Sequence, residues 1–419
     1  MKVLVIGSGA REHAIITALL ADPSVTSVIA APGNAGIAAV VDTRALDVSD
    51  AAAVGDLAVA EEADLVVIGP EVPLVAGSAD AVRARGIACF GPSAAAAQLE
   101  GSKAFAKQVM AEAGVPTAMA HVCTTVDQVA SALDQFGSPY VVKDDGLAAG
   151  KGVVVTSSRD EAMAHAAECL AKGGDARVVI EEYLDGPEVS LFAITDGTTV
   201  LPLQPAQDFK RVGDDDTGPN TGGMGAYSPL PWAPVDLVAD VTSRVLQPVV
   251  DAMARRGTPF SGLLYAGLAM TSRGVRVVEF NARFGDPETQ VVLANLRSPL
   301  GNVLLACAQG RLADIGPLQW DPGFAVTVVI AASGYPAAPR TGDLITGLEE
   351  AADLVGVDVF HAGTTVTEDG IASSGGRVLS VTAQGESLAQ ARERAYAAVD
   401  LVRLEGSHHR RDIAERASR

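Results

Sequence analysis

The sequence predicts a multidomain protein of mixed α/β and α+β architecture. Its 419 residues are enough for roughly three domains of ~150 residues each. A hydrophobic content of 48%, with 43 glycines and only 4% aromatic residues, is typical of compact globular chains. Strands alternate with helices over the first hundred residues, whereas strands follow one another closely after residue 138. These observations predict an N-terminal doubly wound parallel sheet followed by antiparallel α+β units.

The first domain is expected over residues 1–102. Its strands are the apolar runs KVLVIG, TSVIAAPG, DLVVIG and GIACFG. Ligands of such sheets bind at the carboxyl ends of the strands, which here carry the loops GSGARE, APGNAG, GPEVPL and GPS. These loops make Gly9, Arg11 and Glu71 candidate substrate-binding residues.

The first of these loops resembles a dinucleotide-binding fingerprint only in part. The third glycine of that fingerprint is replaced by Glu12, and no acid is placed after the second strand for a ribose hydroxyl. Two alternatives remain, a plain structural turn or an anion bound by free N–H groups near Gly9 and by Arg11.

The second domain is expected over residues 103–321, with a small antiparallel lid subdomain at about 117–188. Its strands PYVVK and GVVVTSS flank the loop DDGLAAGKG. A Walker A loop has four residues between its glycines and Ser or Thr after its lysine, whereas this loop has three and then Gly152. We therefore predict a hairpin whose glycines approach phosphates closely and whose Lys143 and Lys151 meet phosphate oxygens; a solvated turn is the alternative.

Two later segments favour a nucleotide and a metal. The end of VVIEEYLDGPEVS offers backbone groups for an adenine edge and Glu188 for ribose hydroxyls. In VVEFNARFGDPE, Glu279 and Asn281 are two residues apart and share one face of a strand. A carboxylate and an amide oxygen are hard ligands that suit magnesium with bound phosphates.

The remaining elements are a long polar segment, a helix and a third domain. The segment QDFKRVGDDDTGPNTGGMGAYSP has too many Gly, Asp and Pro for regular structure, and loops this long are usually functional. A helix at 235–257 and the strands LLYAGLAMTS and GVRVVEFNARFG follow. The third domain is expected over 322–419 as an α+β cap, with the strands FAVTVVIAAS and GRVLSVTAQ and a final helix from Ser387.

Composition also excludes several classes of function. The net charge of -20 argues against nucleic acid as a partner, because phosphate backbones attract basic surfaces. The four cysteines are far apart and form no CxxC, so neither zinc nor disulfides are expected. The chain shows no signal peptide and no membrane-spanning run. We expect a cytoplasmic protein with small-molecule partners, as a monomer or weak homo-oligomer.

Taken together, these motifs resemble the ATP-grasp ligases and, within them, the glycinamide ribonucleotide synthetase family. The resemblance covers essentially the whole chain, and its most specific blocks are TGPNTGGMGAYSP and NARFGDPETQ. It implies a preATP-grasp domain, an ATP-grasp domain and a C-terminal cap, with no fused downstream enzyme. The implied reaction joins glycine to 5-phosphoribosylamine through glycyl phosphate, giving glycinamide ribonucleotide, ADP and phosphate in purine biosynthesis.

The same resemblance implies roles for individual residues. Lys103 and Lys143 would bind ATP phosphates, and the lid residues are Gly146, Gly150, Lys151 and Gly152. Adenine would contact the hinge residues Glu181, Glu182, Tyr183 and Leu184, and the ribose would contact Glu188. Glu279 and Asn281 would bind magnesium (or manganese). Arg283, Lys143 and Lys210 are the expected catalytic residues, and the alternative for Arg283 is an ion pair with Asp286. The residues expected to bind the substrates are Gly9, Arg11, Glu71, Asp208, Asn220, Gly222, Gly223, Met224, Arg283 and Asp286.

The chain departs from the family pattern at a few positions. The family commonly has alanine at the position of Asp144 and glycine at the positions of Ala10 and Ala414. The strand LLYAGLAMTS also lacks the further metal-binding acid that many ATP-grasp enzymes carry there. Three rival functions stay open: an ATP-grasp ligase for another acid or amine, an inactive nucleotide-binding regulator, and a redox enzyme. Intact Lys143, Glu279 and Asn281 argue against the inactive regulator.

Overall fold

The computed structural model describes residues 1–147 and 152–419. The N-terminal unit is a five-stranded parallel sheet in the order β3-β2-β1-β4-β5, as predicted, with one additional two-residue strand. Along β1, Leu4 and Ile6 join one apolar core, whereas Val3 and Val5 join another, so both faces of the sheet are covered. Its strands and helices are β1 (Lys2–Gly7), α1 (Ala10–Leu20), β2 (Ser27–Pro32), α2 (Ala35–Ala38), β3 (Asp42–Thr43), α3 (Ala51–Ala60), β4 (Leu65–Ile68), α4 (Glu71–Val75), α5 (Ser78–Arg83) and β5 (Ala88–Phe90).

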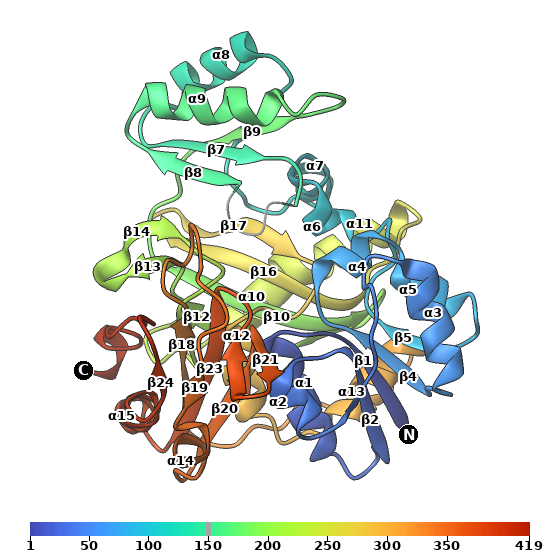
Figure 1. The fold of residues 1–419 in the computed structure, drawn as a ribbon. Helices are drawn as coiled ribbons and strands as arrows, with labels where there is room; N and C mark the ends of the chain where they lie inside the picture. Colours follow the sequence, from blue (N-terminus) through green and yellow to red (C-terminus); the bar gives the residue numbers. More distant parts are fainter. Residues whose placement is uncertain (148–151) are drawn as a thin grey trace.

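The lid subdomain forms a separate layer above the rest of the molecule (Figure 1). Its antiparallel sheet has the order β6-β9-β7-β8 and is covered by two helices, which share a small apolar core of their own around Val129, Val142 and Ile180. Lys143 pairs with Val153, so the predicted hairpin is confirmed. The elements are β6 (Ala120–Cys123), α8 (Val126–Phe136), β7 (Tyr140–Asp144), β8 (Val153–Thr156), α9 (Arg159–Leu170) and β9 (Val178–Glu181).

The central sheet, in the order β11-β10-β16-β17, is antiparallel and carries the predicted metal-binding strand. Gly267 pairs with Glu279 and Leu268 with Val277, so Val278 is the extra residue of a β-bulge. The predicted helix at 235–257 contains a π-helical turn in its middle. The elements are α6 (Gln98–Gly101), α7 (Lys103–Ala113), β10 (Glu188–Asp196), β11 (Val200–Pro202), α10 (Leu237–Val241), η2 (Thr242–Leu246), α11 (Gln247–Arg255), β16 (Ser261–Thr271), β17 (Gly274–Asn281), α12 (Glu288–Ala294), α13 (Leu300–Ala308) and η3 (Leu312–Asp314).

The prediction that the polar segment at 207–229 is irregular is wrong. It forms four strands: β13 (Arg211–Gly213) and β14 (Thr217–Asn220) pair with each other, while β12 (Gln207–Asp208) and β15 (Gly225–Ser228) extend the C-terminal sheet. Strands of two to four residues are too short to show an alternating pattern, and β15 is held by pairing with β18 across the chain.

The C-terminal unit is the α+β cap that the sequence predicts. Its sheet has the order β12-β15-β18-β23-β20, with α15 packed on β18 and β23. The elements are β18 (Phe324–Ala331), β19 (Ile345–Thr346), α14 (Leu348–Ala352), β20 (Val357–His361), β21 (Thr364–Thr367), β22 (Gly370–Ser373), β23 (Arg377–Gly385), α15 (Leu388–Val399), β24 (Arg403–Leu404) and η4 (Arg416–Ser418).

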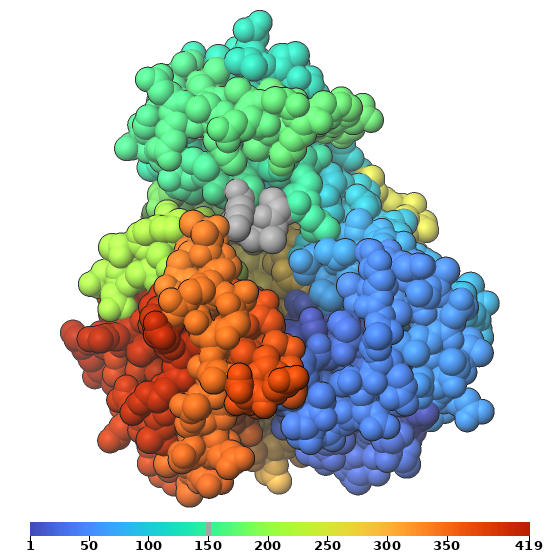
Figure 2. All heavy atoms as spheres, viewed as in Figure 1, coloured from blue at the N-terminus to red at the C-terminus, as the bar shows by residue number. Residues whose placement is uncertain are grey.

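The lid, the N-terminal unit and the C-terminal unit surround the central sheet, and the surface is hollowed where they meet (Figure 2). Across the described ranges 1–147 and 152–419, no helix has both the length and the hydrophobicity that crossing a membrane needs.

Candidate active site

A cleft with a cavity volume of about 1460 Å³ is lined by residues of the lid, the central sheet, the N-terminal unit and the C-terminal unit. Most of the predicted site residues line it, although they come from segments far apart in the sequence. From the start of α7, the lid and its hinge, these are Lys103, Lys143, Gly146, Gly152, Glu181, Glu182, Tyr183, Leu184 and Glu188. From the other units they are Arg11, Glu71, Asp208, Lys210, Asn220, Gly222, Glu279, Asn281, Arg283 and Asp286. The predicted lid residues Gly150 and Lys151 lie outside the described residues.

Lys143 is fixed at the end of the cleft covered by the lid. Its Nζ lies 2.8 Å from Glu181 Oε2 and donates to the carbonyl oxygen of Val278 at 3.1 Å. The β-bulge explains the second contact, because the extra residue of a bulge is left out of the ladder. Burial by itself lowers the pKa of Lys143, but Glu181 and Glu279 outweigh it, so this pKa lies above its ordinary value. Lys143 therefore supplies a fixed positive charge.

The predicted adenine hinge is only partly free for a base. The Glu181 carboxylate is held between Lys143 and Lys107, and the Glu182 carboxylate lies 3.0 Å from Arg273 Nη2. The N–H of Glu182 donates to the carbonyl oxygen of Met119. Within the described part of the chain, the backbone groups of Tyr183 and Leu184 have no hydrogen-bond partner, so these two residues carry the open edge of the hinge.

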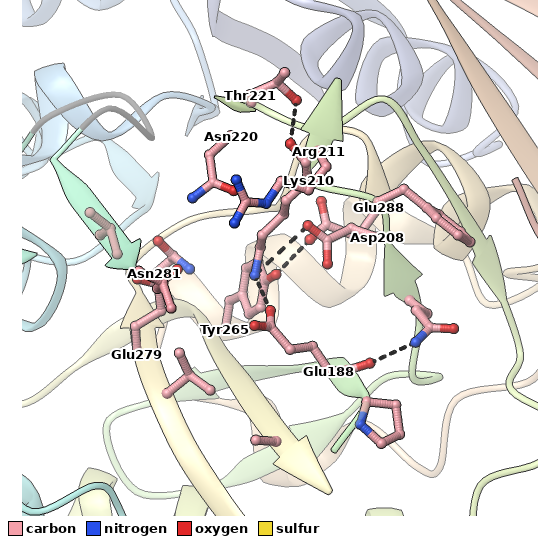
Figure 3. Close-up of a pocket in the computed structure, with 18 of the residues that line it drawn as sticks. Glu188, Asp208, Lys210, Arg211, Asn220, Thr221, Tyr265, Glu279, Asn281 and Glu288 are labelled. Carbon is pink, nitrogen blue, oxygen red and sulfur yellow. Dashed lines mark hydrogen bonds and ion pairs between the residues drawn. The ribbon is translucent and has the colours of Figure 1, made fainter. Parts of the chain in front are cut away.

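Glu279 and Asn281 project into the same cleft from β17 (Figure 3). Neither side chain forms a hydrogen bond or ion pair with another described residue, although both are half-buried. Lys103 lies close enough to Glu279 for that carboxylate to raise its pKa, but burial has the larger effect and the pKa of Lys103 is lowered. No described cluster of three or more His, Cys, Asp or Glu side chains suits a metal, so a metal here would have two protein ligands and need further oxygens.

On the side of the cleft formed by β12 and β13, Lys210 lies between two carboxylates. Its Nζ pairs with Glu188 and lies 4.0 Å from Asp208 Oδ2 (Figure 3). Burial raises the pKa of Asp208 to about 7, with Glu288 and Glu188 adding to the rise and Lys210 opposing it. The Lys210 carbonyl accepts hydrogen bonds from Thr221 N–H and Oγ1 at 2.7 and 2.8 Å, which fixes the strand that presents this side chain.

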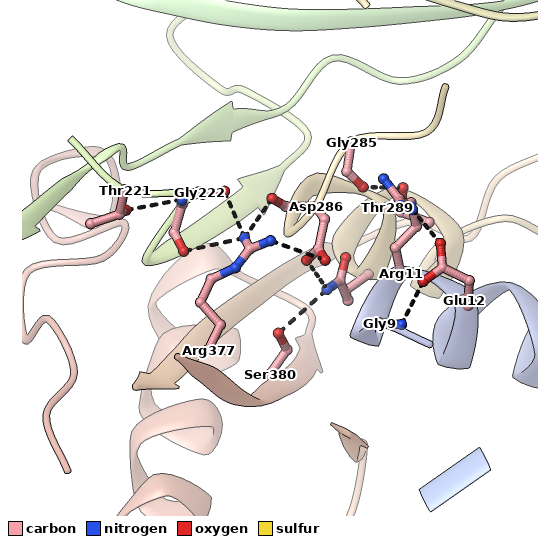
Figure 4. A network of polar contacts seen from close by, with 12 residues as sticks. Gly9, Arg11, Glu12, Thr221, Gly222, Gly285, Asp286, Thr289, Arg377 and Ser380 are labelled. Carbon is pink, nitrogen blue, oxygen red and sulfur yellow. Dashed lines mark hydrogen bonds and ion pairs between the residues drawn. The ribbon is translucent and has the colours of Figure 1, made fainter. Parts of the chain in front are cut away.

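Arg283 is held by two acids of the N-terminal half, and the alternative of an ion pair with Asp286 is wrong. Arg283 Nε lies 3.2 Å from Glu71 Oε2, and Nη2 lies 3.1 Å from Glu100 Oε1. Burial lowers the pKa of Arg283 but Glu100 and Glu71 more than offset it, so the guanidinium is permanently charged. Asp286 instead pairs with Arg377 Nη2 at 3.2 Å (Figure 4).

The first glycine loop does not present the free N–H group that the sequence predicts at Gly9. This N–H donates to Glu12 Oε2 at 2.6 Å, and Glu12 is also paired with Arg11 (Figure 4). A Cβ at Gly9 would lie 2.8 Å from the same carboxylate, and one at Gly69 would lie 2.0 Å from it. The glycines therefore make room for Glu12, an internal carboxylate, at the helix terminus, and this favours the structural turn over the bound anion among the two alternatives.

The loop from Thr221 to Met224 (sequence TGGM) is packed closely against its neighbours. Gly223 has a φ of +113°, and a Cβ there would lie 2.4 Å from Pro287 Cδ, so this position requires glycine. Met224 is completely buried and does not line the cleft, contrary to the prediction for its side chain. Gly9 and Gly223 are likewise absent from the described lining.

Several residues of the cleft were not predicted from the sequence. They are Glu100, Lys107, Tyr265, Glu288 and Arg377. Lys107 follows Lys103 by one helical turn on α7, and this spacing was a usable signal. Tyr265 donates to Glu288 Oε1 at 2.6 Å near Asp208 (Figure 3), a contact between distant segments that no local pattern indicates.

Comparisons with known proteins agree with this geometry. Three family models match consecutive parts of the chain: phosphoribosylglycinamide synthetase, N domain, at residues 1–100; its ATP-grasp (A) domain at 101–289; and its C domain at 325–416. A phosphoribosylamine–glycine ligase of Streptomyces coelicolor is 64% identical over the full length of both chains, and one of Mycobacterium tuberculosis is 58% identical over 100% of this chain and 99% of its own.

Solved structures give the same result. A crystal structure of phosphoribosylamine–glycine ligase from Thermotoga maritima has a TM-score of 0.86 and 33% identity, covering 99% of this chain and 100% of its own. The fold is shared with the biotin carboxylase domain of a Hydrogenobacter thermophilus 2-oxoglutarate carboxylase, which is 17% identical and has a TM-score of 0.73. That comparison covers 97% of this chain and 91% of the other. The chain belongs to the phosphoribosylglycinamide synthetase family of ATP-grasp proteins.

Proposed function

We propose that this protein is an ATP-dependent ligase that joins glycine to 5-phosphoribosylamine, as the names of its relatives state for them. The observation that carries the proposal is the pair Glu279 and Asn281. Their side-chain oxygens lack partners among the described residues, and they line the same cleft as Lys103, Lys143 and Arg283. A site for phosphoryl transfer needs this arrangement, because positioning and positive charge carry most of the catalysis.

The proposed chemistry has two steps. A carboxylate oxygen of glycine attacks the γ-phosphorus of ATP, and ADP leaves, giving glycyl phosphate. The amine of phosphoribosylamine then attacks the glycyl carbonyl carbon, the C–O bond to phosphate breaks, and the amine loses a proton. No protein base is needed at the start, because glycine is already a carboxylate at neutral pH.

The cleft residues fit the nucleotide and its metal. Lys103 and Lys143 would neutralise the phosphates, and the backbone of Tyr183 and Leu184 would receive the adenine edge, beside Val141 and Val155. Glu188 would bind ribose hydroxyls. Glu279 and Asn281 would hold magnesium, with manganese as an alternative, and the metal would supply further charge neutralisation at the phosphates.

The opposite end of the cleft would hold glycine and the amine. Arg283 is fixed by Glu71 and Glu100, so its guanidinium is preorganised to bind the glycine carboxylate or the acyl phosphate. Asp208, Lys210 and Asn220 would complete the substrate pocket. The proposed units remain residues 1–102, 103–321 and 322–419, in a cytoplasmic protein that is a monomer or weak homo-oligomer.

The test is ADP release that depends on both glycine and phosphoribosylamine. With glycine labelled by ¹⁸O in its carboxylate, the proposed steps leave one labelled oxygen in the released phosphate, because the carboxylate is the nucleophile. Unlabelled phosphate would contradict the glycyl phosphate route. ADP release with another acid, and none with glycine, would favour a different ATP-grasp ligase.

A further inference from the structure

Arg410 is a buried charged side chain that none of the steps above uses. It is 1% exposed and lies in the C-terminal tail, 2.7 Å from Asp216 Oδ1 and 2.6 Å from Asp412 Oδ2. Its guanidinium carbon lies 4.9 Å from the centre of the Phe209 ring, and its Nη1 donates to the carbonyl oxygen of Arg211 at 3.2 Å. Arg410 therefore holds the chain on both sides of Lys210.

A second arginine of the C-terminal unit holds the other end of the same segment. Arg377 Nη1 donates to the carbonyl oxygens of Gly222 at 2.6 Å and Asp286 at 2.7 Å, and its Nη2 pairs with the Asp286 carboxylate (Figure 4). The N–H of Gly222 donates to Tyr335 Oη at 3.0 Å, so both backbone groups of this glycine are fixed from the C-terminal unit.

The residues between these two anchors include those proposed to bind substrate. Asp208 and Lys210 lie beside the Arg410 contacts, and Asn220 and Thr221 lie beside the Arg377 contacts. None of the described contacts of Arg377 and Arg410 involves Lys143 or Glu279 at the nucleotide end.

We infer that Arg377 and Arg410 are positioning residues, which hold the segment 208–224 in the geometry that glycine and phosphoribosylamine require. This inference rests on the proposed function for its substrates, and it assigns to the C-terminal unit a role in the site beyond covering it. The anchored segment meets the nucleotide site where Lys210 pairs with Glu188, but the anchors contact neither the phosphate-binding Lys143 nor the metal-binding Glu279. Their loss therefore weakens the glycine and amine sites far more than the nucleotide site.

The experiment uses the full-length protein and the variants Arg377→Gln, Arg377→Lys and Asp216→Asn. Asp216 is the solvent-exposed partner of Arg410, so its change loosens this anchor without placing a cavity in the core. Arg411→Gln is the matched control, since Arg411 is exposed and its side chain forms no hydrogen bond or ion pair with another described residue. The KM values for glycine and phosphoribosylamine, kcat, and the dissociation constant of ATP are measured for each.

We expect Arg377→Gln to raise the KM values for glycine and phosphoribosylamine by about tenfold or more, the effect of losing a charge-assisted hydrogen bond. Asp216→Asn, which removes only the charge of a solvent-exposed partner, should raise them by about threefold. The ATP dissociation constant stays within about twofold, and Arg377→Lys lies between Arg377→Gln and the unchanged protein. A purely structural role would lower the active fraction, and so kcat, with unchanged KM values; that result would overturn the inference, as would an equal loss of ATP affinity.

Amide hydrogen exchange separates this inference from the proposed function. Exchange in residues 208–224 should accelerate in Arg377→Gln and Asp216→Asn, with no change in β7 and β9. If the unchanged protein forms no glycinamide ribonucleotide, the proposed function fails, and exchange alone then decides whether the two arginines hold the segment. Unchanged exchange in both variants would overturn the positioning role.

Discussion

Glu279 is a half-buried carboxylate with no partner among the described residues, although Lys103 and Lys143 lie nearby. Such a group is explained if a metal and phosphates complete its surroundings. We expect Glu279→Ala to lower kcat by more than about 100-fold, since even outer-shell changes at metal sites cost ~10–100-fold. Far-ultraviolet circular dichroism and the melting temperature should stay unchanged, because no described partner is lost. Glu168→Ala, at an exposed lid position, is the control; near-normal turnover of Glu279→Ala would refute the metal assignment.

Asp144 departs from the family pattern, which commonly has alanine here, and it adds a negative charge beside the lid loop. In the structure its carboxylate pairs with Lys172, which follows α9, so the added charge is neutralised within the lid subdomain. We expect Asp144→Ala to change the KM for ATP by less than about threefold and the unfolding free energy by less than about 1 kcal/mol. Steady-state kinetics and urea unfolding would measure these effects.

The partner variant gives a sharper comparison. Asp144 is buried whereas Lys172 is exposed, so Lys172→Met leaves a buried carboxylate unpaired and should destabilise the protein more than Asp144→Ala does. Adding Asp144→Ala to Lys172→Met should restore the stability of Asp144→Ala alone. A large loss of activity in Asp144→Ala would show a catalytic role that this ion pair does not explain.

Among the elements, helix α3 is followed by a residue whose backbone conformation is strained by its side chain. Glu62 has a φ of 49°, and its N–H and that of Ala63 bond to carbonyls of the last helical turn. This is the position after a helix where glycine is preferred, because a Cβ is strained there. We expect Glu62→Gly to raise the unfolding free energy by about 0.5–1 kcal/mol.

The matched control is Glu62→Ala, which removes the charge and keeps the Cβ. It should leave the unfolding free energy within a few tenths of a kcal/mol, as do most exposed substitutions. Equal stabilisation by alanine and glycine in denaturant titrations would show that charge, and not backbone strain, limits stability at this helix end.

The elements also show why some predictions from the sequence succeed and others fail. The apolar strands β1, β4 and β18 and the helix α15 have patterns long enough to be recognised locally, and they are present where predicted. Strands β12 to β15 have no such pattern, because their pairing depends on each other and on β18. Likewise, the spacing of Glu279 and Asn281 on one strand predicts their place in the site. Glu100 and Arg377 pair with Arg283 and Asp286 from distant segments, which no local pattern indicates.

At the scale of the whole molecule, the N-terminal and C-terminal units meet at a pair of buried histidines. His13 Nδ1 accepts a hydrogen bond from the N–H of His361 at 3.0 Å, and the His361 ring contacts Thr364 Oγ1. A Cβ at Gly36 would lie 2.4 Å from the His361 ring, so this glycine allows the two units to approach. Asn34 Nδ2 adds a hydrogen bond to the His361 carbonyl oxygen at 2.7 Å.

This interface makes stability depend on pH. Burial, and for His13 also the neighbouring His361, lowers the pKa of His13 from 6.5 to about 3 and that of His361 to about 4. Near neutral pH both histidines are uncharged in the folded protein, and below pH 6.5 they bind protons only in the unfolded chain. The stability they contribute is therefore complete above pH 6.5. It is lost as the pH falls toward 4 for His361 and toward 3 for His13, by up to about 1.4 kcal/mol per pH unit for each. We expect His13→Asn, whose Oδ1 can accept the same hydrogen bond, to reduce this slope in urea unfolding between pH 7 and pH 5. His121→Asn, an exposed lid histidine, should keep the full slope. An unchanged slope in His13→Asn would show that other groups set the acid limit of the fold.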